Sequence, residues 1–234
     1  MNLAAPALRS FANGEALAQA LADHVSQALK HRIARDGRAA LAVSGGRTPL
    51  RFFDALAARE LDWSAVDITL VDERWVDETS PRSNARLLRE HLLQGAAGAA
   101  RFLPLYVDAA TPEAARAQLE THLAALPLPF AAVVLGMGED GHTASLFPGG
   151  DRLVQALDPT STSLIQTMRA PGAEEPRITL TLPAITASDS VALHIEGEAK
   201  RRVLEAALAD ESTPLPISAV LSQCTHPATI FWCP

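Results

Sequence analysis

Apolar side chains recur along the chain with two spacings, and the alternation between these spacings predicts the elements of the fold. Apolar positions three and four residues apart indicate an amphipathic helix over residues 13–35, ended by Asp36-Gly37. Short uncharged or alternating runs predict strands. They occur at residues 39–43, 66–71, 101–106, 131–135, 164–167, 177–182, 191–195 and 228–232.

Helices are predicted between most of these strands. Thr48 before Pro49 is typical of an N-cap followed by a first helical residue, and Thr111-Pro112 repeats that signal. The predicted helices after residue 48 cover residues 49–57, 83–93, 111–126 and 196–209, and residues 214–221 are predicted to form a loop and turn. Strands that alternate with helices, without repeats or a domain boundary, indicate one layered α/β domain over residues 1–234, with a mostly parallel sheet flanked by helices.

Composition and charge exclude several classes of protein. A chain of 234 residues suits one domain with a sizeable core. No apolar run approaches the roughly 18 residues that a membrane span needs, and charges interrupt residues 1–30 where a signal peptide would be apolar. The net charge of −7 argues against nucleic acid or an anionic membrane as partner, but leaves room for an anionic small molecule. We therefore expect a cytoplasmic protein.

The two cysteines support the same compartment. Cys224 and Cys233 lack the histidine partners of a zinc site and are too few for a disulfide framework. We expect both to be small buried side chains in a reducing environment.

The glycine-rich stretch at residues 136–150 carries the strongest chemical signal. It follows the apolar strand 131–135, and α/β proteins bind ligands at such strand ends. Asp140 stands two residues before His142 on this constrained turn, where its carboxylate can reach the imidazole and fix the tautomer. An imidazole held in this way is suited to proton transfer near neutral pH.

Two further loops offer groups for an anion. Residues 44–49 join a strand to a helix start, and the amides of Gly45 and Gly46 with the hydroxyls of Ser44 and Thr48 could cradle a phosphate. Plain turn chemistry would also explain this loop. Arg74 follows the strand 66–71 and can hold a phosphate through its forked guanidinium, although an ion pair with Asp72 or Glu73 is the structural alternative.

These motifs together resemble the 6-phosphogluconolactonases, a branch of the group that includes glucosamine-6-phosphate deaminases and ribose-5-phosphate isomerases. The resemblance lies in G-x-G-x-D-G-H-T-A-S-L-F-P-G at 136–149, S-G-G-x-T-P at 44–49 and D-E-R-x-V at 72–76, with weaker R-I-T-L and G-x-x-K matches at 177–180 and 197–200. It implies a modified Rossmann-like fold and the hydrolysis of 6-phospho-D-glucono-1,5-lactone to 6-phosphogluconate in the pentose phosphate pathway. No step of this reaction needs a metal or organic cofactor, and we expect a monomer or small homo-oligomer.

The resemblance assigns roles to individual residues. His142 would act as general base and then general acid, and Asp140 would orient it. The phosphate would be held by Ser44, Gly45, Gly46, Thr48, Arg74, Arg177 and Lys200.

Three other functions remain open at this point. A glucosamine-6-phosphate deaminase or isomerase is the nearest, but such deaminases continue their histidine segment as I-A-F-N-E, and Phe147 stands here in place of the glutamate. A serine hydrolase using Ser44 is suggested by the segment Ala-Val-Ser-Gly-Gly at 42–46, an imperfect nucleophile elbow. A regulator that binds sugar phosphates without turnover is the non-enzymatic alternative.

Overall fold

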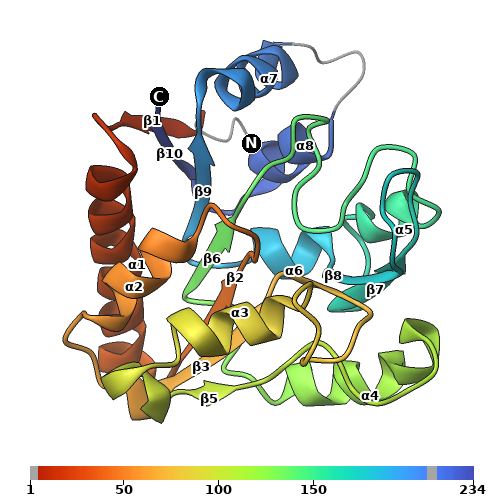
Figure 1. The fold of residues 1–234 in the computed structure, drawn as a ribbon, viewed down its shortest axis with the longest axis horizontal. Helices are drawn as coiled ribbons and strands as arrows, with labels where there is room; N and C mark the ends of the chain where they lie inside the picture. The colour runs from red at the N-terminus through yellow and green to blue at the C-terminus, as the bar shows by residue number, and fades with distance from the viewer. Residues whose placement is uncertain (1–4, 210–214) are drawn as a thin grey trace.

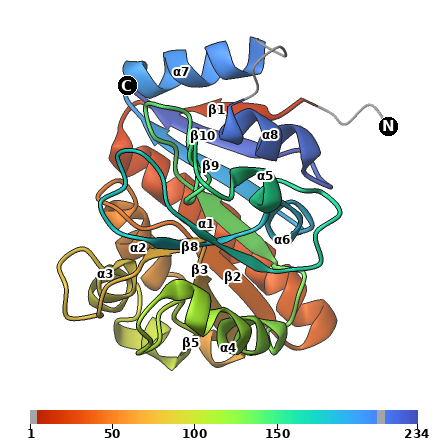
Figure 2. The same ribbon diagram turned by 90° about the vertical axis from the view of Figure 1, so that its right-hand side faces the viewer.

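The computed structural model describes residues 5–209 and 215–234, and its centre is a parallel sheet in the order β1-β10-β9-β6-β2-β3-β5. Figure 2 shows this sheet running from β1 and β10 to β5. Its strands are β1 (Ala7–Ser10), β2 (Ala39–Val43), β3 (Val66–Leu70), β5 (Arg101–Phe102), β6 (Ala132–Leu135), β9 (Val191–Glu196) and β10 (Thr229–Cys233). The central strands β2, β3 and β6 are buried along their whole length, which explains the apolar composition of β2 and β6. The predicted α/β fold is confirmed.

Helices cover both faces of the sheet. Figure 1 shows α1 and α2 on one side and α6 and α8 on the other. The helices are α1 (Gly14–Asp36), α2 (Leu50–Ala57), α3 (Asn84–His91), α4 (Pro112–Ala124), α5 (Leu153–Ala156), α6 (Leu182–Thr186), α7 (Glu198–Ala209) and α8 (Pro216–Gln223), with 3-10 turns η1 (Trp63–Ala65) and η2 (Gly95–Ala99). None of the helices in the described ranges has both the length and the apolar character needed to cross a bilayer.

A second, antiparallel sheet stands beside the first. It has the order β4-β8-β7, formed by β4 (Asp72–Arg74), β8 (Arg177–Leu180) and β7 (Ile165–Met168). In the β4–β8 pair, Arg74 lies directly opposite Arg177. Two arginines far apart in the sequence therefore project from the same face of one small sheet.

The structure corrects several predicted boundaries. Residues 216–223 form helix α8 and not a loop, with Pro216 in its first turn, while Pro214 lies outside the described residues. The strand predicted at 101–106 is only two residues long. Strand β1 was not predicted, because all four of its residues are exposed at the sheet edge and show no apolar pattern.

The start of α2 also differs from the prediction. Thr48 was expected to be the N-cap, but the helix begins at Leu50 and Pro49 occupies the cap position, where no side chain accepts a hydrogen bond. The Thr48 hydroxyl is therefore not used for capping.

Candidate active site

A cavity of about 380 Å³ lies where the loops after β2 and β6 meet the small sheet. Ligands are expected at this edge of a parallel sheet. The residues predicted from the sequence to bind the substrate all line the cavity, and His142 lines it with them. They are Ser44, Gly45, Gly46, Thr48, Arg74, Arg177 and Lys200. Asp140 does not line the cavity but contacts the ring of His142 from behind.

Asp140 holds His142 through two contacts. Its Oδ1 lies 2.5 Å from the ring Nδ1 of His142 and accepts a hydrogen bond from the His142 backbone amide at 3.1 Å. Partial burial disfavours the Asp140 carboxylate, but the hydrogen bonds from His142 outweigh burial, so the pKa of Asp140 is lowered. An ionised Asp140 keeps a proton on Nδ1 and leaves Nε2 of the ring as the proton acceptor.

Glycine at position 138 is required by this arrangement. A Cβ on Gly138 would lie 2.3 Å from two ring atoms of His142 and 2.6 Å from Asp140 Oδ1. The Gly138 amide also donates to the His142 carbonyl at 2.9 Å, which closes the turn under the ring. The turn therefore fixes the position of the imidazole relative to the backbone of Gly138.

The loop at 44–46 is tied to the histidine loop by its serine. The Gly136 amide donates to Ser44 Oγ at 3.0 Å, so this oxygen acts as an acceptor. No imidazole or carboxylate in the described ranges forms a hydrogen bond to Ser44 Oγ, whereas an activated serine nucleophile needs an adjacent base. A Cβ on Gly45 would lie 2.0 Å from Asn84 Oδ1, so only glycine allows α3 to approach the loop this closely.

Helix α2 begins directly after the cavity-lining residues Thr48 and Pro49. Its leading amides have no acceptor within the helix and no side-chain cap. Free amides at a helix N-terminus, together with the helix dipole, favour an anion.

The two arginines of the small sheet present unused donors. Arg177 is 8% exposed, and Nε of both Arg74 and Arg177 is buried without a hydrogen-bond partner among the described residues. Arg74 donates through Nη1 to the carbonyl of Arg82, and it forms no ion pair with Asp72 or Glu73 in the described part of the chain. Burial lowers the pKa of Arg177. The Asp72 carboxylate opposes this decrease, and the Arg74 guanidinium adds to it. An anion placed between the two guanidinium groups would offset both the cost of burying the Arg177 charge and the repulsion between Arg177 and Arg74.

Phe147 separates the histidine from the second arginine. Its ring centroid lies 4.4 Å from that of His142, and the Arg177 guanidinium lies 5.6 Å from the same ring. Phe147 is 8% exposed and lines the cavity. The aromatic ring thus gives the cavity an apolar wall beside both His142 and Arg177.

Sequence reasoning missed some residues of the cavity. Asp72 was considered only as an ion-pair partner, yet it lines the cavity and accepts from Ser145 Oγ at 2.5 Å. Ala144 also lines the cavity, with φ of 49°, a left-handed backbone that non-glycine residues seldom adopt. His194 was included in an apolar strand. Its position at the carboxyl end of β9 was the available signal.

No group of three or more His, Cys, Asp or Glu side chains within residues 5–209 and 215–234 is arranged to hold a metal ion. Cys224 and Cys233 are both buried and free, as expected.

The sequence matches the family model of glucosamine-6-phosphate isomerases/6-phosphogluconolactonase over residues 12–232. The chain belongs to the glucosamine-6-phosphate isomerase/6-phosphogluconolactonase family. Within this family it is 50% identical, over 96% of its length and 97% of the relative's, to a protein of Rhizobium meliloti (strain 1021) named 6-phosphogluconolactonase. A Pseudomonas aeruginosa protein of the same name is 44% identical over 93% of this chain and 90% of that one.

Solved structures of family members agree with the fold. The crystal structure of a 6-phosphogluconolactonase from Shewanella baltica OS155 superposes with a TM-score of 0.95 at 41% identity, covering all of both chains. A monomeric glucosamine-6-phosphate deaminase superposes with a TM-score of 0.78 at 18% identity, over 97% of each chain. Because a deaminase shares the fold, the chemistry has to be argued from the cavity.

Proposed function

We propose that this chain hydrolyses 6-phospho-D-glucono-1,5-lactone to 6-phosphogluconate, a step of the pentose phosphate pathway. The observation that carries the proposal is that His142, which Asp140 holds, lines one cavity together with the cationic side chains of Arg74 and Arg177. The cavity offers both a base and cations, which suits a substrate that carries an ester and a phosphate. The 6-phosphogluconolactonases at 50% and 44% identity support the same reaction.

His142 carries the proton in both steps. In the first, Nε2 accepts a proton from water while the water oxygen bonds to the lactone carbonyl carbon, and the carbonyl oxygen becomes an oxyanion. In the second, the bond from that carbon to the ring oxygen breaks, the carbonyl reforms, and the proton passes from His142 to the ring oxygen. Asp140 stabilises the imidazolium between the steps. Positioned proton transfer of this kind contributes roughly a hundred- to ten-thousandfold.

The phosphate is held at the other end of the substrate. Arg74 and Arg177 donate from the small sheet, Lys200 donates from α7, and the loop 44–48 offers amides and the free Thr48 hydroxyl. Each guanidinium can bind two phosphate oxygens through its forked donors. The phosphate thereby sets the distance between the lactone carbonyl and His142.

Phe147 disfavours the deaminase alternative. It occupies the position at which the related deaminases carry a glutamate, and a phenyl ring cannot exchange protons. The serine hydrolase alternative is disfavoured by Ser44 Oγ, which accepts the Gly136 amide and has no base beside it. The regulator alternative is disfavoured by the intact pair of Asp140 and His142.

A coupled dehydrogenase assay with freshly made 6-phosphogluconolactone tests the proposal. His142→Gln is expected to reduce kcat by roughly a hundred- to ten-thousandfold, because the base is lost. His31→Gln, on the exposed side of α1, is the matched control and should leave kcat unchanged. Lactone hydrolysis by His142→Gln at the wild-type rate would refute the role of His142. Ammonia release from glucosamine 6-phosphate by the wild type would identify a deaminase instead.

We further propose that residues 1–234 work as one domain in the cytoplasm, as a monomer or small homo-oligomer. The two buried thiols support a reducing compartment. Size-exclusion chromatography with light scattering tests the assembly state.

A further inference from the structure

His194 is a third buried side chain of the cavity with a nitrogen that has no partner. It is 3% exposed and lines the cavity. Its Nε2 lies 3.1 Å from Glu196 Oε1, while Nδ1 has no hydrogen-bond partner within residues 5–209 and 215–234. Leaving a buried polar atom without a partner is unfavourable. Within the described part of the chain, the other such nitrogens belong to Arg74 and Arg177, which also line this cavity.

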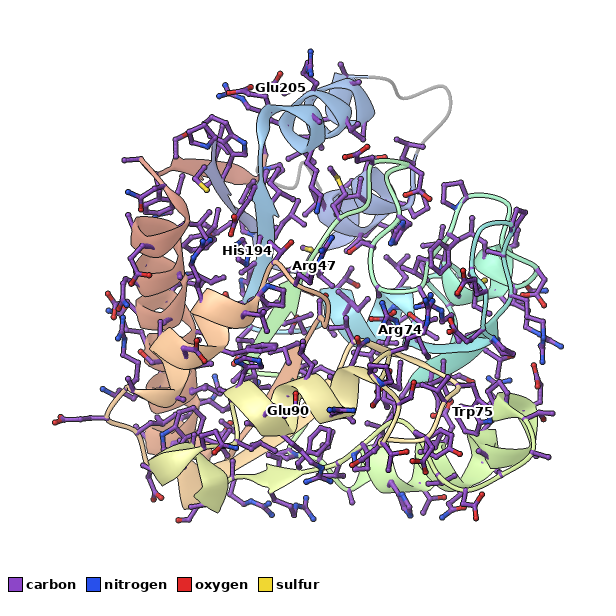
Figure 3. All side chains as sticks on the ribbon, viewed as in Figure 1. Arg47, Arg74, Trp75, Glu90, His194 and Glu205 are labelled. Atoms are coloured by element: carbon purple, nitrogen blue, oxygen red, sulfur yellow. The ribbon has the colours of Figure 1, made fainter. Side chains whose placement is uncertain are left out.

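The sheet places His194 two strands from the loop at 44–46, with the end of β6 between them. Leu193 on β9 pairs with Leu135 on β6, so His194 lies level with Gly136, whose amide donates to Ser44 Oγ. Gly136 has no side chain to separate the imidazole from that loop. In the view of Figure 3, His194 lies on β9, on the side of Arg47 opposite Arg74.

We propose that Nδ1 of His194 binds the phosphate of the substrate, and that this contact forms with the uptake of one proton. The inference rests on the proposed function, because it takes the phosphorylated lactone as the ligand. Glu196 keeps a hydrogen on Nε2, so the neutral ring presents a lone pair at Nδ1, which repels a phosphate dianion. The contact is favourable when the ring carries a second proton, or when the phosphate carries one and donates it to Nδ1. Either form contains one proton more than the separate neutral ring and dianion.

The charged groups around His194 come from several elements. Glu196 lies on its own strand, and Arg51 of α2 reaches the Glu196 carboxylate at 3.7 Å. Lys200 of α7 lines the same cavity, and Cys233 of β10 is the register partner of Glu196. On the α1 side, the ring of His24 packs on Phe231 of β10, which is the register partner of His194. Burial and the nearby Arg9 lower the pKa of His24. Arg51 balances Glu196, and the added proton offsets part of the new negative charge of the phosphate.

Two variants separate phosphate binding from a structural role. His194→Leu removes both ring nitrogens at similar volume, and we expect KM for 6-phosphogluconolactone to rise about ten- to a hundredfold with kcat within about twofold, as for loss of a charge-assisted hydrogen bond. KM for unphosphorylated gluconolactone should not change. His194→Asn places an amide donor near the position of Nδ1, so it should recover part of the loss.

The matched control is His24→Leu, which removes a half-buried ring that hydrogen-bonds to Ser190 and does not line the cavity. We expect it to leave both KM values unchanged. Proton uptake is measured by isothermal titration calorimetry of 6-phosphogluconate at pH 8, in two buffers of different ionisation enthalpy. The wild type and His24→Leu should take up more protons than either His194 variant.

Each outcome decides the inference. An unchanged KM for the phosphorylated lactone in His194→Leu would overturn it, and so would an equal rise for both lactones, which indicates a structural role. Recovery in His194→Asn with wild-type proton uptake would overturn the proton component. A wild type that does not prefer the phosphorylated lactone would instead overturn the proposed function.

Discussion

Glu73 connects the small sheet to the start of α3 through a buried carboxyl group. It is fully buried and accepts four hydrogen bonds. Its Oε1 accepts from the amides of Arg74 at 2.8 Å and Asn84 at 2.9 Å, and its Oε2 accepts from the Ala85 amide at 2.8 Å and Ser83 Oγ at 3.2 Å. Ionisation of Glu73 is therefore opposed by burial and favoured by its donors.

Burial is the larger effect. It raises the pKa of Glu73 from 4.5 to about 7, with the nearby Asp72 carboxylate adding to the rise and the three backbone amides opposing it. At about 1.4 kcal/mol for each pH unit, the difference corresponds to about 3 kcal/mol. Between pH 4.5 and 7 the native state binds more protons at this group than the unfolded chain, so the stability of the native state falls as pH rises. The free-energy cost of ionising the buried Glu73 is absent below pH 4.5 and complete above about pH 7.

Urea unfolding of wild type and Glu73→Gln at pH values from 5 to 8 measures the effect. The stability of the wild type relative to the variant should fall across this range by most of the roughly 3 kcal/mol. Glu113→Gln is the control. Its hydrogen bond from Arg169 lowers the pKa of Glu113 to about 2, so its difference from wild type should be flat above pH 5. A flat difference for Glu73 would refute the reasoning and show that its donors outweigh burial.

Two further predictions concern the loops of the cavity. In the lactone assay, Gly138→Ala should reduce kcat by roughly a hundredfold, because the new methyl group displaces the His142 ring. The control is Gly98→Ala, whose Cβ meets nothing closer than 3.5 Å, and it should leave the rate unchanged. Arg74→Gln should raise KM for the phosphorylated lactone by about ten- to a hundredfold and spare gluconolactone, whereas the exposed Arg35→Gln should change neither. Equal losses on both lactones in Arg74→Gln would contradict a phosphate contact.

The sequence indicates the parallel sheet because buried strands leave uninterrupted apolar runs, as at residues 39–43 and 132–135. It also indicates the pairing of Asp140 with His142, since residues two apart on a glycine turn are forced close together. It could not indicate that Arg74 faces Arg177, because antiparallel pairing without a hairpin leaves no local signal. His194 was missed for a similar reason, since its partner-free nitrogen depends on which strands lie beside β9.

The cross-strand arrangement of Arg74 and Arg177 has a consequence for the free enzyme. Like charges placed opposite each other weaken a sheet, so the unliganded protein keeps the β4–β8 ribbon under mutual repulsion. Neutralising either arginine should yield a molecule that resists heat better and recognises its ligand worse.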